Sequence, residues 1–329
     1  MTTRRELLTA FAAAALMNAG GPVTRSRAQA GSGIARILVG FPPGGTSDII
    51  ARLLAGTMSG YASAIVVENR PGAGGRVAIE SLKSAARDGS IFLITPLATI
   101  TLYPHVYKAL SYDSLKDFTP VTSVAAAPSL LTIGPKVPAS VKTLADFVAW
   151  CRANPTQANY GSPGAGTSPH FIGVQFGRAA GFEYIHVPYQ GNAPAAQDVL
   201  GGQIASSVLT IDSTLPYVLA GKLRALATTG PQRSTFLPDV PTFIESGYPG
   251  IQLIDMWTVF LPANTPEDRV GKLNASIQKA LQSDEMKAGL ARLSIEVSAV
   301  SRADFAKLVK SDFERWGAIV QASGFTPQD

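Results

Sequence analysis

The stretch that decides the fold is IARILVGFPPGGTSDIIARLLAGTM, residues 34–58. The apolar segment 34–39 predicts a strand, and the Pro and Gly residues of 41–47 predict a turn. The Ile and Leu residues of 48–58 recur at helical spacing. The same order then continues with a strand at 65–67, a helix at 77–86 and a strand at 91–95. This βαβαβ order predicts right-handed crossovers and a mainly parallel sheet.

A second α/β unit is expected farther along the chain. Residues 121–133 are nearly uncharged, which is typical of an extended segment that crosses into another domain. Helix and strand patterns then alternate at 144–153, 159–160, 169–180, 184–188, 193–201 and 204–209. Residues 223–228 predict a strand that returns to the first domain. Because 329 residues exceed what one core usually serves, we expect an α/β fold of two lobes with a ligand cleft between them. Domain 1 is expected at 31–125 and 229–329, and domain 2 at 126–228.

The first 30 residues have the three parts of a signal peptide. Met1 to Arg5 is basic, Leu7 to Met17 is apolar, and Ala28-Gln29-Ala30 offers the small residues that a signal peptidase recognises. The apolar part is shorter than the roughly 20 residues that span a bilayer. Arg4 and Arg5 also fit a twin-arginine signal, so the twin-arginine and general secretory routes both remain open. Either route predicts an exported protein in the periplasm.

The charge of the chain points away from nucleic acid. The full sequence has 28 Lys and Arg against 23 Asp and Glu, a formal charge of +5. Removal of residues 1–30 leaves 24 basic against 22 acidic residues, because this segment carries four Arg and one Glu. A mature charge of +2 without a basic stripe is not typical of a nucleic-acid binder. The single Cys151 lies in a predicted helix, where we expect a small buried side chain.

The first motif that could bind a ligand is FPPGGTSD, residues 41–48, between a strand and a helix. Its glycines let backbone N–H groups approach a ligand closely, and the helix start adds a partial positive charge. Strand, glycine-rich turn and helix together form an anion site, although the alternative is a tight turn in which Ser47 or Asp48 caps the helix. The spacing does not match a nucleotide-binding loop. The candidate ligand-binding residues are Phe41, Gly44, Gly45, Thr46 and Asp48.

The second motif is YGSPGAGTSPH, residues 160–170, which has the same order in the second lobe. Pro169 suits the first helical position, and Thr167 or Ser168 can cap the helix while the other points its hydroxyl outward. Two such turns, one in each lobe, can hold one carboxylate-bearing ligand between them. The candidate residues are Ser162, Gly164, Ala165, Gly166, Thr167, Ser168 and His170.

A third set of candidates lies at other strand ends. The turn 95–99 and the segment 186–194 follow strands, and open α/β sheets bind ligands at the carboxyl ends of their strands. This set adds Ala98, Thr99 and Tyr189. His186 also fits a buried core histidine, and His170 also fits a hydrogen bond at a helix start.

Enzyme patterns are weak in this sequence. It contains no G-x-S-x-G or H-E-x-x-H pattern, and its three histidines are scattered. We therefore expect no enzyme, no metal and no cofactor. The alternative class is a secreted serine hydrolase that uses Ser168 and His170, although a spacing of two residues does not by itself join a nucleophile to its base.

Several ordered motifs resemble one known family, the Bug-type, TctC-like extracytoplasmic solute receptors of tripartite tricarboxylate transporters. The resemblance rests on FPPGG with Asp48, VENRPGAGG (67–75), YGSPGAGTSPH, HVPYQGNAPAAQDVLGGQ (186–203), AGKLRALATTGPQRS (220–234) and LPDVPTFIESGYPG (237–250). It implies a type II periplasmic-binding-protein fold that closes on a small organic acid, such as a di- or tricarboxylate or an aromatic acid. It also implies that the two glycine-rich turns bind the ligand, partly through backbone N–H groups and ordered water. We expect a monomer that binds the subunits of a membrane permease transiently. The alternative partner is a sensor.

The sequence departs from the family pattern at two places. Where family members usually carry acidic residues, this chain has Ala205 and Leu209, with Asp212 three residues later. We include Leu209 among the ligand-binding candidates and expect the loss of that carboxylate to disfavour an ammonium group. The segment 257–261 lacks the usual Gly after Trp257 and looks one residue shorter, which puts any ligand contact carried over there in doubt.

Overall fold

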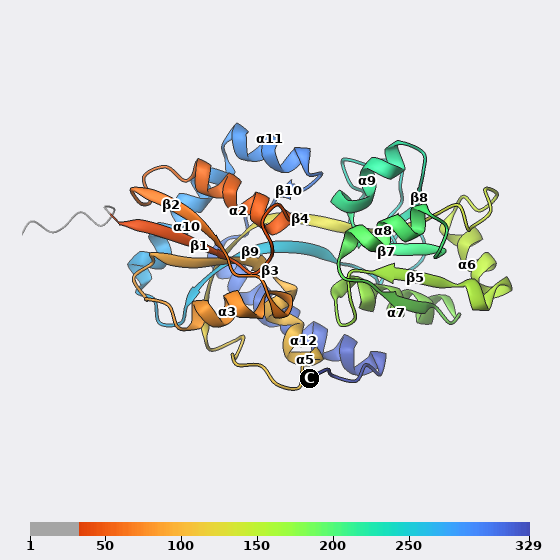
Figure 1. Ribbon diagram of the computed structural model, residues 1–329, viewed down its shortest axis with the longest axis horizontal. Coiled ribbons are helices and arrows are strands. Elements are labelled where there is room, and N and C mark those ends of the chain that lie inside the picture. The colour runs from red at the N-terminus through yellow and green to blue at the C-terminus, as the bar shows by residue number, and fades with distance from the viewer. Residues whose placement is uncertain (1–32) are drawn as a thin grey trace, which may run out of the picture.

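The computed structural model describes residues 33–329, so the predicted signal peptide lies outside the described residues. It shows two α/β lobes side by side, with long strands running between them (Figure 1). One ten-stranded sheet has the order β2-β1-β3-β9-β4-β7-β5-β6, and β8 and β10 both pair with β4. The predicted α/β class and its two lobes are therefore confirmed.

Lobe 1 is built on the predicted parallel βαβαβ unit. Its strands are β1 (Ile34–Val39), β2 (Ala64–Asn69) and β3 (Ile91–Pro96), and β1 pairs in parallel with both of the others. Side chains alternate between the two faces of a strand. Accordingly, Ile37 packs in one buried cluster with helices α2 (Thr46–Thr57), α10 (Glu267–Leu281) and α11 (Asp284–Arg292). Leu38 packs on the other face with α3 (Arg76–Lys83).

Lobe 2 has the same layered construction. Strand β5 (Asn159–Ser162) pairs in parallel with β6 (Ile185–Pro188) and β7 (Ser206–Thr210). The helices are α6 (Leu144–Ala153), α7 (Ser168–Ala180), α8 (Asn192–Leu200) and α9 (Ile211–Leu219). Cys151 is fully buried in the same cluster as Phe147 and Phe176, so the prediction of a buried small side chain is confirmed.

Three long elements join the lobes. Strand β4 (Phe118–Ile133) is the predicted crossing segment: its first part pairs with β9 (Ile254–Pro262), and from Ser129 on it pairs with β7 and β8 (Arg224–Thr228). Helix α12 (Arg302–Ser323) passes beneath both lobes in Figure 1. Its Phe305 packs in a cluster of lobe 1, and its Trp316 packs in the cluster of lobe 2. We keep the predicted domain division at 125/126 and 228/229 as a proposal.

Several short elements were not predicted. Helix α9 contains Pro216, whose missing N–H removes one backbone donor, and this residue hides the helical pattern of 211–219. The predicted turn at 95–99 is in fact the end of β3 followed by a short helix. The remaining short elements are α4 (Ala98–Thr101), α5 (Tyr103–Val106), β10 (Glu296–Val297), and the 3₁₀ turns η1 (Ala73–Gly75) and η2 (Pro155–Gln157). Within residues 33–329, no helix combines the length and apolar character that a membrane span requires.

Candidate functional site

The turn of residues 41–46, which we name turn 1, is held by the carboxylate of Asp48. Its Oδ2 accepts hydrogen bonds from the Gly44 N–H and from Arg52 Nε, each at 2.9 Å. Its Oδ1 accepts from Asn69 Nδ2 at 2.9 Å. Burial alone would raise the pKa of Asp48, but the hydrogen bonds from Arg52, Gly44 and Asn69 outweigh it and hold the pKa below its ordinary value. Asp48 is therefore an ionised anchor for turn 1.

Helix α2 begins at Thr46, the last residue of turn 1, and has no side-chain cap. Gly45 precedes the helix, and neither Ser47 nor Asp48 caps it, so the predicted capping role is wrong. The N–H groups of a first helical turn have no intrahelical acceptor, and residues 41–46, which lead into the helix, are exposed or half-buried. The turn also needs Gly40, because a Cβ there would lie 2.6 Å from the Cα of Gly75.

The turn of residues 162–168, which we name turn 2, is held by neutral groups. Ser162 Oγ lies 2.7 Å from His186 Nε2 and donates to the Gly164 carbonyl at 3.0 Å. Thr167 Oγ1 donates to the same carbonyl at 2.7 Å, so it does not cap α7. Turn 2 is thus tied to itself and to β6, while the first turn of α7, like that of α2, lacks a side-chain cap.

Two stacked imidazole rings lie behind turn 2. The ring centroids of His170 and His186 are 3.9 Å apart. Burial lowers the pKa of His170 to about 4, and burial together with the neighbouring His170 lowers the pKa of His186 to about 3. Both rings are neutral at pH 7. The Gly166 N–H donates to His170 Nδ1 at 3.2 Å, which is the helix-start hydrogen bond expected for this residue.

Ser168 is bonded to a carboxylate and not to His170. Its Oγ donates to Asp255 Oδ1 at 3.0 Å, and Ser129 Oγ donates to Asp255 Oδ2 at 3.0 Å. The Ser168–His170 pair that a hydrolase would need is therefore not joined in this structure. Burial raises the pKa of Asp255 to about 6 against the opposing effect of the two serine hydrogen bonds, and the charges of Asp212 and Asp312 add to the rise. Asp255 ties turn 2 to the crossing strands β4 and β9.

One hydrogen bond joins turn 1 directly to lobe 2. Thr46 Oγ1 donates to Asp212 Oδ2 at 3.0 Å. Asp212 lies in the first turn of α9, at the carboxyl end of β7. Asp212 and Asp255 were not among the candidate residues. The only sequence signals for them were an acidic residue after a predicted strand and a lone acidic residue within an apolar segment.

Three of the remaining candidates, Thr99, Tyr189 and Leu209, bond or pack within their own lobes, and the fourth, Ala98, lines a cavity. Thr99 is buried, and its Oγ1 donates to the Pro96 carbonyl at 2.8 Å. Tyr189 donates its hydroxyl to Asp198 at 2.6 Å. Leu209 is fully buried in an apolar cluster of lobe 2, so it offers no surface to a ligand in this structure. Ala98 lines a cavity of about 280 Å³ together with Asp255 and residues of α12.

The candidates divide by burial. Partly or fully exposed are Phe41, Gly44, Gly45, Thr46, Ala98, Gly164, Ala165, Thr167 and Tyr189. Buried are Asp48, Thr99, Ser162, Gly166, Ser168, His170 and Leu209. The structure thus places the exposed backbone of the two turns where a ligand could reach it, while most side chains of the motifs support that backbone from behind.

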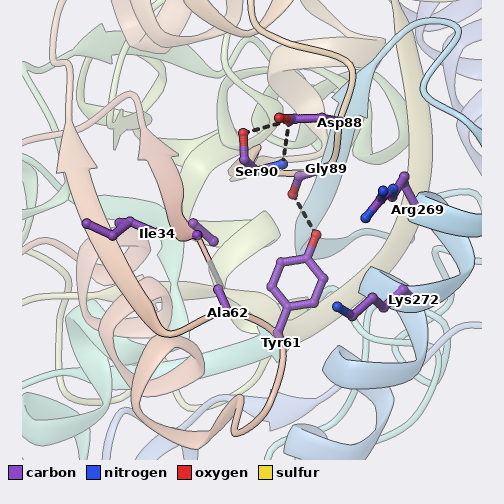
Figure 2. Close-up of a pocket in the computed structure, with 10 residues that line it drawn as sticks. Ile34, Tyr61, Ala62, Asp88, Gly89, Ser90, Arg269 and Lys272 are labelled. Carbon is purple, nitrogen blue, oxygen red and sulfur yellow. Dashed lines mark hydrogen bonds between the residues drawn. The ribbon is translucent and has the colours of Figure 1, made fainter. Parts of the chain in front are cut away.

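A pocket of about 200 Å³ lies at the opposite end of lobe 1, at the amino ends of β1 and β3 (Figure 2). Arg269 and Lys272 of α10 reach toward Tyr61, whose hydroxyl donates to the Gly89 carbonyl at 2.5 Å. None of the candidate residues lines this pocket. Open α/β sheets bind ligands at the carboxyl ends of their strands, so the two turns and not this pocket form the candidate site. In the described part of the chain, no group of three His, Cys, Asp or Glu residues is arranged to hold a metal ion.

Residues 50–325 match the sequence model of a protein family, TctC, described as "Tripartite tricarboxylate transporter family receptor". The chain belongs to this family. Protein BugT of Bordetella pertussis is similar to this receptor, with 31% identity over 88% of this chain and 89% of BugT. The Bug-type resemblance of the sequence is therefore confirmed.

Two solved structures extend the comparison to the fold. R. palustris Rpa4515 with adipate has a TM-score of 0.80 and 30% identity, and the alignment covers 89% of this chain and 98% of that one. MatC from Rhodopseudomonas palustris with bound malate has a TM-score of 0.75 and 30% identity, over 87% of this chain and 98% of that one. This receptor thus shares its overall architecture with both of these ligand-bound proteins.

Proposed function

We propose that this receptor captures a small organic carboxylate in the periplasm, between turn 1 and turn 2, and delivers it to the permease subunits of a tripartite transporter. The observation that carries the proposal is the pairing of the two turns. Each precedes a helix without a side-chain cap, one lies in each lobe, and Thr46 of turn 1 already contacts Asp212 of lobe 2. Uncapped helix starts favour anions through their free N–H groups and the helix dipole.

Hydrogen bonds from the two turns can provide a micromolar affinity without a cationic side chain. Hydrogen bonds to a charged group contribute roughly 1.5–3 kcal/mol each. A micromolar dissociation constant corresponds to about 8 kcal/mol. Four or five contacts from the two turns would therefore suffice. Adipate and malate in the two similar structures are small dicarboxylates, which supports this ligand class for the present chain.

The proposal extends to export and partner. Residues 1–30 would direct the chain to the periplasm and be removed there, by the twin-arginine or the general secretory route. The mature receptor would then act as a monomer that meets the permease only when loaded. Delivery to a sensor is the alternative, and it uses the same ligand-bound state.

The test is a binding screen on the purified mature chain. Mono-, di- and tricarboxylates, aromatic acids and amino acids are screened by thermal shift, and hits are measured by calorimetry, with MatC and malate as the positive control. We expect at least one acid to bind in the micromolar range or tighter. If no acid binds while the control responds, the proposal is wrong. Labelling of Ser168 by a fluorophosphonate serine probe would instead support the hydrolase alternative.

A further inference from the structure

Asp212 has one carboxylate oxygen that nothing in the described chain satisfies. Its Oδ2 accepts the hydrogen bond from Thr46, while Oδ1 is shielded from solvent and has no hydrogen-bond partner. The two oxygens share one carbon, so Oδ1 lies beside turn 1 as well. A buried acceptor without a donor costs free energy, and a carboxylate has room for about four donated hydrogen bonds. A ligand bound by turn 1, as proposed above, would therefore lie beside this carboxylate.

Asn192 provides a second open polar atom at the same end of lobe 2. It begins α8, and its Nδ2 donates to Thr210 Oγ1 at 2.9 Å. Its other amide atom, Oδ1, is buried without a partner. Thr210 immediately precedes α9 and lies 3.3 Å, hydroxyl to hydroxyl, from Ser213. Two buried oxygens at the starts of neighbouring helices thus lack a hydrogen-bond donor, and one of them belongs to the carboxylate that contacts turn 1.

The turns and Asp212 offer opposite hydrogen-bonding chemistry. Turn 1 and the first turn of α2 present N–H donors, which suit the carboxylate of a ligand. Asp212 Oδ1 is an acceptor, which a plain carboxylate cannot satisfy and would even repel. A group that donates a hydrogen bond satisfies it without displacing Thr46. A ligand that bonds both to the N–H groups of turn 1 and to Asp212 Oδ1 therefore carries a carboxylate and, beside it, a hydroxyl or an ammonium group.

On the basis of the proposed function, we infer that Asp212 is a specificity-determining residue that selects acids with a hydrogen-bond donor next to the carboxylate. Leu209, the candidate residue at the end of β7, is fully buried and has no polar side-chain atom to offer a ligand. Asp212 supplies an acceptor from α9 instead. A site built to bond a hydroxyl or amine rejects the analogue that lacks it, because its own polar group is then left unpaired. This selectivity works against the expectation that the Leu209 substitution disfavours an ammonium group.

The test compares acids that differ only in the donor. Calorimetry on the mature receptor measures succinate, malate and aspartate, then propionate, lactate and alanine, then 3-phenylpropionate, 3-phenyllactate and phenylalanine. In whichever series binds to the receptor, we expect the hydroxy or amino member to bind at least about tenfold tighter than the parent acid. The hydroxyl and ammonium arms show which donor Asp212 accepts. Asp212→Asn is expected to reduce that ratio to within about twofold, since an amide can keep the Thr46 bond while its NH₂ replaces the open acceptor.

Two control variants distinguish a loss of selectivity from the loss of the contact between the lobes and from a change in net charge. Thr46→Val removes the bond between the lobes and should weaken both members of a series by the same factor, leaving their ratio unchanged. Glu183→Gln removes an exposed carboxylate from the same lobe and should change neither affinity. Equal binding of all members by the unmodified receptor, or a ratio retained in Asp212→Asn, overturns this inference while the proposed function stands. If no member of any series binds while another carboxylate of the wider screen does, this inference is wrong and the proposed function stands. If no carboxylate binds to a receptor that still unfolds cooperatively, both are wrong.

Discussion

Turn 1 and turn 2 share a sequence pattern but are held in different ways. Turn 1 is exposed and is fixed by one ionised carboxylate, Asp48, whose partners include Arg52. Turn 2 is more buried and is fixed by hydroxyls and by the neutral rings of His170 and His186. The difference shows that one strand–turn–helix pattern can be held in place by different kinds of side chain. The buried charge of Asp48 is compensated by donors that include Arg52. Turn 2 relies mainly on neutral groups, and Asp255, the carboxylate that contacts it, has its pKa raised by burial.

The largest effect is expected from side chains placed on the two turns. Gly45→Val and Gly164→Val should each weaken ligand binding at least about 100-fold, because a branched side chain would block access to the backbone N–H groups. Neither should unfold the protein. Gly45 has a φ of −76°, and a Cβ at either glycine would meet no atom closer than 3.4 Å. Calorimetry gives the affinity and urea denaturation gives the stability.

The matched control is Gly56→Val, which adds the same side chain to α2, where a Cβ meets nothing within 4 Å. It should bind ligand normally. If only one of the two turn variants loses affinity, the ligand is held by that lobe alone. Full affinity in a folded variant would remove that turn from the site.

The second effect concerns the carboxylate that ties turn 2 to the crossing strands. Burial raises the pKa of Asp255 to about 6 from an ordinary value of 3.8. A raised pKa in the folded state contributes stability that is fully present below pH 3.8 and is lost as the pH rises through about 6. Asp255→Asn has no such charge. We expect its free energy of unfolding, relative to that of the unmodified protein, to rise between pH 4 and pH 7, by up to about 3 kcal/mol.

Asp239→Asn, which changes an exposed carboxylate, serves as the control for the general effect of net charge. Urea denaturation at half-unit steps of pH from 4 to 7.5 gives both difference profiles. A difference between Asp255→Asn and the unmodified protein that stays constant across this range would mean that Asp255 does not titrate there. The tie to turn 2 would then be equally strong at every pH.

The sequence allowed the two turns to be predicted because their signals are local. Strand, glycine-rich turn and helix follow one another within residues 34–58, and the same order returns at 160–180. The carboxylates that contact the two turns could not be predicted this way. Asp212 meets a residue 166 positions away in the chain, and Asp255 meets partners 126 and 87 positions away. Their importance depends on contacts that only the folded chain creates.

Leu209 illustrates the opposite error. Its place in a family pattern suggested a ligand contact, but alternation along β7 turns its side chain into the apolar cluster of lobe 2. Helix α9 was overlooked because Pro216 interrupts its pattern, and with it the first turn that carries Asp212. Local sequence patterns thus predicted the two turns of the candidate site, whereas the side chains around those turns depend on how strands and helices pack.

The smallest expected effect compares the supports of the two turns directly. Asp48→Asn should lower the free energy of unfolding by about 1–3 kcal/mol, because an amide cannot accept from both the Gly44 N–H and Arg52 at one atom while also accepting from Asn69 at the other. Thr167→Val should cost less than about 1 kcal/mol, since the Gly164 carbonyl keeps its hydrogen bond from Ser162. Urea denaturation at pH 7 measures both. Equal losses would show that turn 2 depends on a single contact as much as turn 1 does, and the contrast between a charged and a distributed support would have to be abandoned.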